Sequence, residues 1–142
     1  MQLSLVPPTA TEFRDLYQQT GWRDVSLETC EAALAGTWLA CTARDENGTV
    51  VGMGRLISDG VLHAFVTEML VAESARGGGL GAQIIRMLVT AARERGVDDI
   101  QLFAARGRAA FYERNGFRRR PDDAPGMDLT DGDEGTAPTD AA

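Results

Sequence analysis

The first hydrophobic pattern along the chain has the spacing of an amphipathic helix. Phe13, Leu16 and Tyr17 fall on one face of a segment that begins near residue 10 and ends near residue 20. Thr9 or Thr11 can cap this helix, because a threonine hydroxyl accepts a hydrogen bond from an unpaired N–H group of the first turn. The pattern therefore predicts a helix that packs an aromatic face against a core.

A second short helix is expected between Ser26 and Gly36, and three strand-like stretches follow it. The strands are predicted over residues 38–43, 49–57 and 61–72. A loop with an Asn-Gly pair separates the first two strands, and a Ser-Asp-Gly turn separates the second from the third. Because strands joined by such tight turns pair antiparallel, the pattern predicts a three-stranded antiparallel unit.

From Leu80 the hydrophobic spacing becomes helical again, and this helix is expected to end at Gly96. Beyond it we expect a strand over residues 99–104, a short helix over residues 108–114 and closing strands over residues 117–119 and 127–129. This order of elements predicts a layered α/β fold of the α+β type, with a mixed, mostly antiparallel central sheet flanked by helices.

Length and charge refine this picture. A chain of 142 residues has the length of one domain, which is predicted over residues 1–130. Residues 131–142 hold four acidic residues and no basic ones, so an acidic disordered tail is predicted there. The net charge is −7, and the rest of the chain still carries −3 without this tail. This balance argues against nucleic-acid binding through a general basic field.

Several partner classes are not expected. The chain lacks a hydrophobic run of the ~20 residues that a membrane span needs, and its N-terminus lacks the pattern of a secretory signal. Cys30 and Cys41 are too few for a disulfide framework or a zinc site, and they are interpreted as reduced, buried thiols. The chain is therefore expected to be cytoplasmic, without a metal, a membrane or a nucleic-acid partner.

The segment from Val71 to Gln83 carries three consecutive glycines between a predicted strand and a predicted helix. The unpaired N–H groups and the positive dipole end of that helix would suit a diphosphate, and Arg76 can add a charged contact. A plain glycine-rich turn is the alternative. The chain has no lysine for a P-loop, and the strand before the glycines is not the first strand of a parallel unit, as the dinucleotide fingerprint requires.

Two motifs resemble the signatures of the Gcn5-related N-acetyltransferase (GNAT) superfamily. Arg76, Gly79 and Gly81 match the motif Q/R-x-x-G-x-G/A, which in that family lies between the fourth strand and the third helix. Further along, the sequence Ala-Phe-Tyr-Glu-Arg-Asn-Gly-Phe at residues 110–117 resembles the family segment A-x-x-F-Y-x-x-x-G-F. The resemblance covers about residues 3–130 and is strongest to small bacterial single-domain members.

This resemblance implies acetyl-CoA as the co-substrate. The glycine loop would bind its pyrophosphate through backbone N–H groups, and the end of the long strand would pair with its pantetheine arm like an added strand. The residues expected to make these contacts are Met69, Leu70, Val71, Arg76, Gly77, Gly78, Gly79, Leu80, Gly81 and Ala82. In the family the same strand also carries a bulge and diverges from its neighbour.

Acetyl transfer to an amine needs a neutral amine, a donor to the carbonyl oxygen and a proton for the departing thiolate. By the resemblance, Tyr112 donates that proton, since a phenol with a pKa of ~10 is protonated at neutral pH; simple packing is its alternative role. The Leu70 N–H would contact the carbonyl oxygen. Glu68, a carboxylate in a nearly apolar strand, would bind the amine or relay its proton, unless it is exposed or salt-bridged. His63 is interpreted as a half-buried structural residue of the same strand.

Trp22 is the second candidate for substrate binding beside Glu68, because it follows a glycine in the region that the family uses to shape the acceptor pocket. The resulting hypothesis is an acetyl-CoA-dependent N-acetyltransferase that acts on a primary amine of a small molecule by direct attack in a ternary complex. A protein or peptide N-acetyltransferase and a non-catalytic acyl-CoA-sensing regulator are the alternatives. A homodimer, which is common in the family, is also expected.

Overall fold

The computed structural model describes residues 1–131, and the chain divides into two compact units. The first unit is Met1–Leu102, and the second begins at Phe103. From residue 132 onward, the predicted acidic disordered tail lies outside the described residues. A single domain over residues 1–130 remains a prediction.

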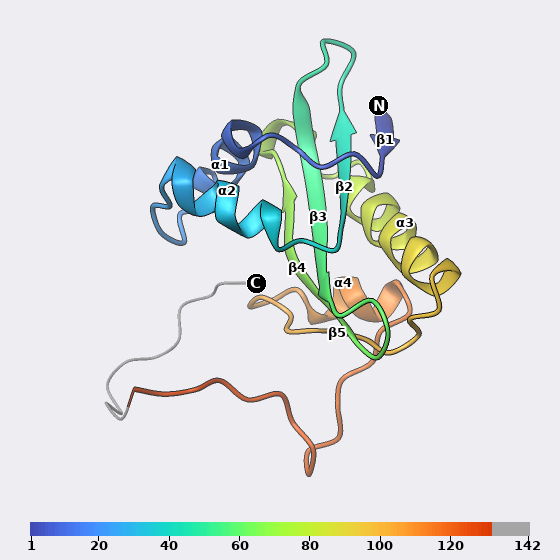
Figure 1. Cartoon of the computed structure of the whole chain (residues 1–142). Helices are drawn as coiled ribbons and strands as arrows, with labels where there is room; N and C mark the ends of the chain where they lie inside the picture. Colours follow the sequence, from blue (N-terminus) through green and yellow to red (C-terminus); the bar gives the residue numbers. More distant parts are fainter. Residues whose placement is uncertain (132–142) are drawn as a thin grey trace. The chain divides into compact units, whose positions relative to one another are not determined.

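A five-stranded sheet forms the centre of the first unit (Figure 1). Its strands lie side by side in chain order: β1 (Gln2–Ser4), β2 (Leu39–Arg44), β3 (Val50–Ser58), β4 (Ala64–Val71) and β5 (Ile100–Leu102). The first four strands pair antiparallel, and β5 pairs with β4 in parallel. The predicted mixed, mostly antiparallel sheet is therefore confirmed.

Helices of the first unit cover both faces of this sheet (Figure 1). On one face, α1 (Ala10–Gln18) packs on α2 (Leu27–Ala35) and contacts β3 and β4. On the other face, α3 (Leu80–Glu94) contacts β2, β3 and β4. The three helices form where the hydrophobic spacing predicts them, and a short 3-10 helix, η1 (Glu73–Ala75), precedes the glycine loop. None of the described helices combines the length and the apolar composition that crossing a bilayer requires.

Two glycines of β3 let α3 lie directly on the sheet. A Cβ atom at Gly52 would stand 2.9 Å from the Ile84 side chain and 3.0 Å from that of Leu80. A Cβ atom at Gly54 would stand 2.8 Å from the Leu88 side chain. Because the interior is close-packed, larger residues at these two positions would push the helix away. This packing holds the helix whose first turn belongs to the candidate site.

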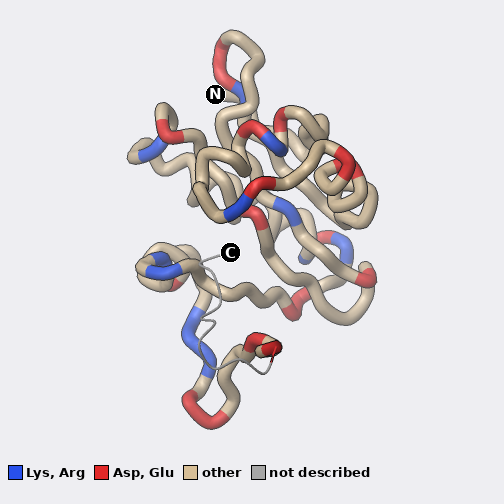
Figure 2. Tube along the Cα trace, turned by 90° about the vertical axis from the view of Figure 1, so that its left-hand side faces the viewer, with Lys and Arg blue, Asp and Glu red and all other residues tan. Residues whose placement is uncertain are grey.

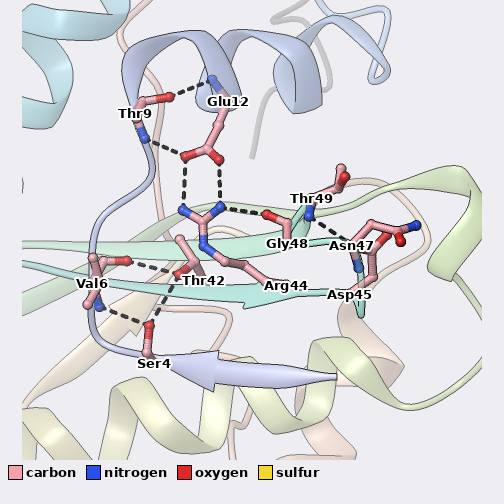
Figure 3. Close-up of polar contacts among 10 residues, drawn as sticks. All are labelled: Ser4, Val6, Thr9, Glu12, Thr42, Arg44, Asp45, Asn47, Gly48 and Thr49. Carbon is pink, nitrogen blue, oxygen red and sulfur yellow. Dashed lines mark hydrogen bonds and ion pairs between the residues drawn. The ribbon is translucent and has the colours of Figure 1, made fainter.

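A capping box and an ion pair attach the start of α1 to β2 (Figure 3). The Glu12 N–H donates to Thr9 Oγ1 at 3.1 Å, and the Thr9 N–H donates to Glu12 Oε1 at 2.9 Å. The same carboxylate accepts hydrogen bonds from Arg44 Nη1 at 2.7 Å and Nη2 at 3.1 Å. The hydrogen bond from Arg44 is the main reason that the pKa of Glu12 lies below its ordinary value. Of the two candidate threonines, Thr9 is therefore the N-cap.

The strand predicted over residues 61–72 is shorter than expected, because β4 begins at Ala64. The Asp59 carboxylate accepts hydrogen bonds from the N–H groups of Val61 and Leu62, each at 2.8 Å. A side chain that binds the backbone in this way offers the chain an alternative to sheet pairing. The turn after β3 therefore extends as far as residue 63.

The remaining differences concern short strands. The hydrophobic pattern does not predict β1, and only the middle of the strand expected over residues 99–104 forms as β5. The closing strands predicted over residues 117–119 and 127–129 are wrong: the described part of the second unit holds α4 (Ala109–Arg114) and no strand. The Phe117 N–H instead donates to the Tyr112 carbonyl at 3.0 Å and closes the end of α4.

Candidate active site

Strand β4 carries a bulge in the segment expected to contact the pantetheine arm. Its pairing with β3 shifts register there, so that Glu68 and Met69 stand opposite the single residue Gly54. Glu68 has a φ of +45° and is the one non-glycine residue with a positive φ among those described. A Cβ atom at Gly54 would lie 2.5 Å from the Met69 sulfur, so the glycine makes room for the bulge. The bulge that the family resemblance implies is present.

The bulge lies where β4 and β5 diverge. The two strands pair only at Ala64, Phe65 and Val66 of β4. From Thr67 to Val71, the edge of β4 away from β3 has no partner strand among the described residues. The backbone along an edge of this kind can bind an extended ligand as it would bind another strand.

The Glu68 carboxylate is nearly buried and forms an ion pair with Arg55 of β3, so the salt-bridged alternative named for it is the one found, and its contact with the amine remains a prediction. Its Oε1 atom accepts hydrogen bonds from Arg55 Nε at 2.9 Å and Nη2 at 2.6 Å, and its Oε2 atom accepts one from the Thr67 hydroxyl. The exposed fractions of the Arg55 and Glu68 side chains are 10% and 13%. A carboxylate offers about four lone-pair positions, so roughly one on Oε2 remains for a further donor.

Arg55 is the residue of this region that the sequence analysis does not identify. Its Nη1 atom donates to the Ala33 carbonyl at 3.3 Å, in the last turn of α2, and to Thr37 Oγ1 at 3.1 Å. Its guanidinium carbon lies 5.9 Å from the centroid of the Phe13 ring on α1. The signal was an arginine inside an apolar strand, because a buried charge requires a partner.

The glycine loop leads into the uncapped N-terminus of α3. Gly79 occupies the N-cap position with a φ of +79°, and no side chain bonds to the first turn. A Cβ atom at Gly77, Gly78 or Gly79 would have no neighbour within 4 Å. No acidic residue stands in the first turn. Among the described residues, the positive end of the helix dipole is therefore open to an anion.

Arg76 stands at the entry to this loop, and its side chain turns back towards β4. Its Nε atom donates to the Val71 carbonyl at 3.1 Å, and the side chain is exposed. Its two terminal nitrogens have no hydrogen bond to another described residue. The arrangement leaves these nitrogens accessible to an anion, and the contacts predicted for Arg76 and Val71 remain predictions.

Trp22 extends a row of aromatic rings that begins on α1. Its ring lies edge to face on Tyr17, with a distance of 5.6 Å between centroids, and Tyr17 lies 6.0 Å from Phe13. Phe13 and Tyr17 are buried, whereas Trp22 is half-buried. Since Phe13 also contacts the Arg55 guanidinium, the row connects Trp22 with the ion pair at the bulge.

His63 lies outside the strand, in the turn before β4. Its Nδ1 atom is 2.5 Å from Asp99 Oδ2, and 67% of its side chain is exposed. The interpretation of His63 as a half-buried strand residue is therefore wrong. The cause is the turn that the Asp59 carboxylate extends.

Tyr112 belongs to the second unit, where α4 presents it between two other aromatic rings. The centroids of Phe111 and Phe117 lie 4.9 and 5.8 Å from its own, and both rings stand nearly perpendicular to it. Burial raises the pKa of the Tyr112 phenol above its ordinary value of 10, and the charge of Arg108 opposes this shift. The phenol is therefore protonated at neutral pH, the state in which it can act as an acid.

The side chains that commonly bind metals are dispersed among the described residues, and both cysteines lie in the interior. The described residues contain no group of three or more His, Cys, Asp and Glu side chains that could hold a metal ion. Cys30 and Cys41 are free and buried, which confirms their interpretation as buried thiols. Burial raises the pKa of Cys41 to about 11, and its sulfur lies 3.5 Å from the Met87 sulfur.

Known proteins resemble the chain in sequence. The family described as acetyltransferase (GNAT) domain matches residues 36–119. The uncharacterized N-acetyltransferase ycf52 of Pyropia yezoensis is 29% identical over 119 residues, which cover 82% of this chain and 68% of that protein. The chloroplastic serotonin N-acetyltransferase 2 of Oryza sativa subsp. japonica is 37% identical over 90 residues, which cover 63% of this chain and 45% of that protein.

A solved structure agrees with the family match. The GNAT family acetyltransferase from Streptococcus pneumoniae TIGR4 has a TM-score of 0.76 and an identity of 25%. The match covers 93% of this chain and 97% of that protein, whereas the chain spans less than half of the rice relative. The matched segment contains the bulge, the glycine loop and α4. The chain therefore belongs to the GNAT family of acetyltransferases and is an enzyme of the N-acetyltransferase type.

Proposed function

We propose that the chain transfers the acetyl group of acetyl-CoA to a primary amine of a small molecule, by direct attack in a ternary complex. The start of α3 is the observation that supports this proposal. The space beside three consecutive glycines is open, and the helix that follows them has neither a side-chain cap nor an acidic residue in its first turn. Accessible N–H groups and the helix dipole together favour the binding of a diphosphate, and the glycines, which have no side chains, let the diphosphate approach the backbone.

Acetyl-CoA supplies the acetyl group as an activated thioester. In the proposed site, the backbone at the start of α3 and the Arg76 side chain bind its pyrophosphate. The free edge of β4 binds its pantetheine arm, and the Leu70 N–H stabilises charge on the carbonyl oxygen. The residues proposed for these contacts are Met69, Leu70, Val71, Arg76, Gly77, Gly78, Gly79, Leu80, Gly81 and Ala82.

The amine and the thiolate require two further groups. Glu68 accepts a hydrogen bond from the amine through the position on Oε2 that its other partners leave open, and the proton that the nitrogen loses as the amide forms passes by this carboxylate to water. Trp22, half-buried at the end of the aromatic row, contacts the body of the acceptor. Tyr112, whose phenol is protonated at neutral pH, donates its proton to the departing thiolate and regains one from water.

Two observations favour an arylalkylamine as the first acceptor to test. The rice relative is named for serotonin, and half-buried Trp22, packed edge to face on Tyr17, offers aromatic surface to such a molecule. Acidic and basic residues are interspersed along the described trace (Figure 2), which favours a small acceptor over a peptide selected by one sign of charge.

The test combines acetyl-CoA binding by calorimetry with thiol release across a panel of acceptors. The panel contains serotonin and other arylalkylamines, amino acids, polyamines, aminosugars and a few peptides. Thiol release that depends on one class of small amine supports the proposal. Release with peptides alone identifies a protein or peptide acetyltransferase, and binding without release identifies an acyl-CoA sensor. Absence of acetyl-CoA binding overturns the proposal as a whole.

A further inference from the structure

The backbone of Glu68 adopts a conformation that its residue type disfavours. With a φ of +45°, its Cβ atom approaches a neighbouring carbonyl, a contact that glycine alone avoids. Such a conformation persists only where the surrounding structure holds it. Residues Met69 and Leu70 follow directly, so the orientation of their backbone groups depends on this torsion angle together with the pairing of Leu70 with Met53.

The side chain of Glu68 is held from several directions. Two N–H groups of Arg55 and the Thr67 hydroxyl bind its carboxylate. The Nη1 atom of Arg55 is itself fixed by the Ala33 carbonyl and the Thr37 hydroxyl. The carboxylate is therefore attached, through one guanidinium, to the end of α2 and the segment that follows it.

We propose that Arg55 is a positioning residue for acetyl transfer. It holds Glu68 in the left-handed conformation through the carboxylate, and the bulge then presents the backbone of Met69 and Leu70 to the co-substrate. This inference deepens the proposed function and rests on it, because the same strand segment is proposed to bind acetyl-CoA. Arg55 acts through Glu68 and does not touch the reacting atoms.

An arginine suits this task better than a lysine. Its nitrogens are separated in a rigid plane, so Nε and Nη2 bind Glu68 while Nη1 binds Ala33 and Thr37. A lysine carries the same charge on a single nitrogen and cannot span these partners. Arg55→Lys therefore keeps the charge of the ion pair and loses the anchor.

The first experiment separates the backbone of Glu68 from its carboxylate. Glu68→Gly and Glu68→Ala both leave Arg55 without its partner and both remove any contact with the amine. The two variants differ in their backbone, because glycine adopts a positive φ more easily than alanine does. We expect Glu68→Gly to bind acetyl-CoA at least about fivefold more tightly than Glu68→Ala by calorimetry. Equal dissociation constants in the two variants would overturn the proposal.

The second experiment compares two arginines that each bind a carboxylate within the first unit. Arg55→Lys is expected to raise the dissociation constant of acetyl-CoA at least about fivefold. Arg44→Lys weakens the pair with Glu12 between β2 and α1, and its acetyl-CoA affinity should stay within about twofold of the wild type. Thermal unfolding verifies that both variants are folded. Equal changes in the two variants, or no change in Arg55→Lys, would contradict the positioning role.

The wild type distinguishes this inference from the proposed function. If the wild type does not bind acetyl-CoA, the proposed function fails, and the inference fails with it. If the wild type binds and the variants of Arg55 and Glu68 bind equally well, the inference alone fails. Because both Glu68 variants also lose the proposed contact with the amine, a lower turnover number in both is expected in either case, and acetyl-CoA affinity unchanged from the wild type in both would overturn the positioning role.

Discussion

At the scale of single residues, Tyr112 offers a direct test of the proposed chemistry. Its half-buried ring packs against those of Phe111 and Phe117, and partial burial raises the pKa of its phenol above the ordinary value of 10. A phenol that stays protonated throughout the neutral range can donate to a thiolate, whereas a phenylalanine ring keeps the packing and loses the proton.

Tyr112→Phe is therefore expected to lower the turnover number by about 100-fold or more, while acetyl-CoA affinity stays within about twofold. Steady-state kinetics and calorimetry measure the two quantities. Because the pKa is raised, the wild type should show no loss of activity from Tyr112 ionisation below about pH 10. An equal loss of affinity and turnover would mean that the hydroxyl is structural.

A second residue-scale prediction uses two glycines with almost the same φ angle. Gly79 in the loop has a φ of +79° and Gly48 in the β2–β3 turn has a φ of +80°, and a Cβ atom at either would have no neighbour within 4 Å. Valine should destabilise both positions by about 1–2 kcal/mol, because its branched side chain disfavours positive φ.

Only Gly79→Val is expected to lose acetyl-CoA binding, by at least about tenfold, while Gly48→Val retains it. Urea denaturation verifies that the two variants have similar free energies of unfolding, and calorimetry compares their dissociation constants for acetyl-CoA. Similar affinities in both variants would contradict the assignment of the pyrophosphate to the start of α3.

At the scale of elements, the link between α1 and β2 has a defined dependence on pH. Arg44 lowers the pKa of Glu12 below 4.5, so the folded state binds this proton less readily than the unfolded state. The corresponding stabilisation is complete above the unfolded pKa and is lost as the pH falls through the folded value. Both side chains are partly exposed, so the effect is modest.

Glu12→Gln isolates this contribution, since glutamine can still complete the capping box with Thr9. The free energy of unfolding of the wild type should exceed that of the variant most at pH 7, and the difference should shrink below about pH 4.5. Urea denaturation at pH 7, 5 and 3.5 measures it. A difference that does not change with pH would contradict the role of the Arg44 ion pair.

Elements differ in how well the sequence predicts them. Helices α1 and α3 have repeated hydrophobic positions and recognisable ends, and both form as predicted. The start predicted for β4 is wrong because the Asp59 carboxylate binds the backbone N–H groups that would otherwise pair in the sheet. Hydrophobic spacing does not report this competition. Short strands such as β1 contain too few residues to establish a period.

At the scale of the molecule, the sequence predicts the family and the glycine loop, but it does not locate the bulge. The register shift depends on which residue of β3 stands opposite Glu68, and pairing of this kind is set by the whole sheet. Each of the two residues opposite or beside the bulge is unusual by itself, because Gly54 is a glycine and Arg55 a charged residue within an apolar strand. Their joint role appears only when β3 and β4 lie side by side.

The buried thiols of Cys30 and Cys41 have a practical consequence for enzymology. With a pKa of about 11, Cys41 is ionised to roughly one part in a thousand at pH 8, and burial raises the pKa of Cys30 as well. An aromatic disulfide reagent should therefore react with liberated coenzyme A and leave the folded enzyme unmodified. Acetyl transfer can then be followed continuously by absorbance, without a background signal from the protein.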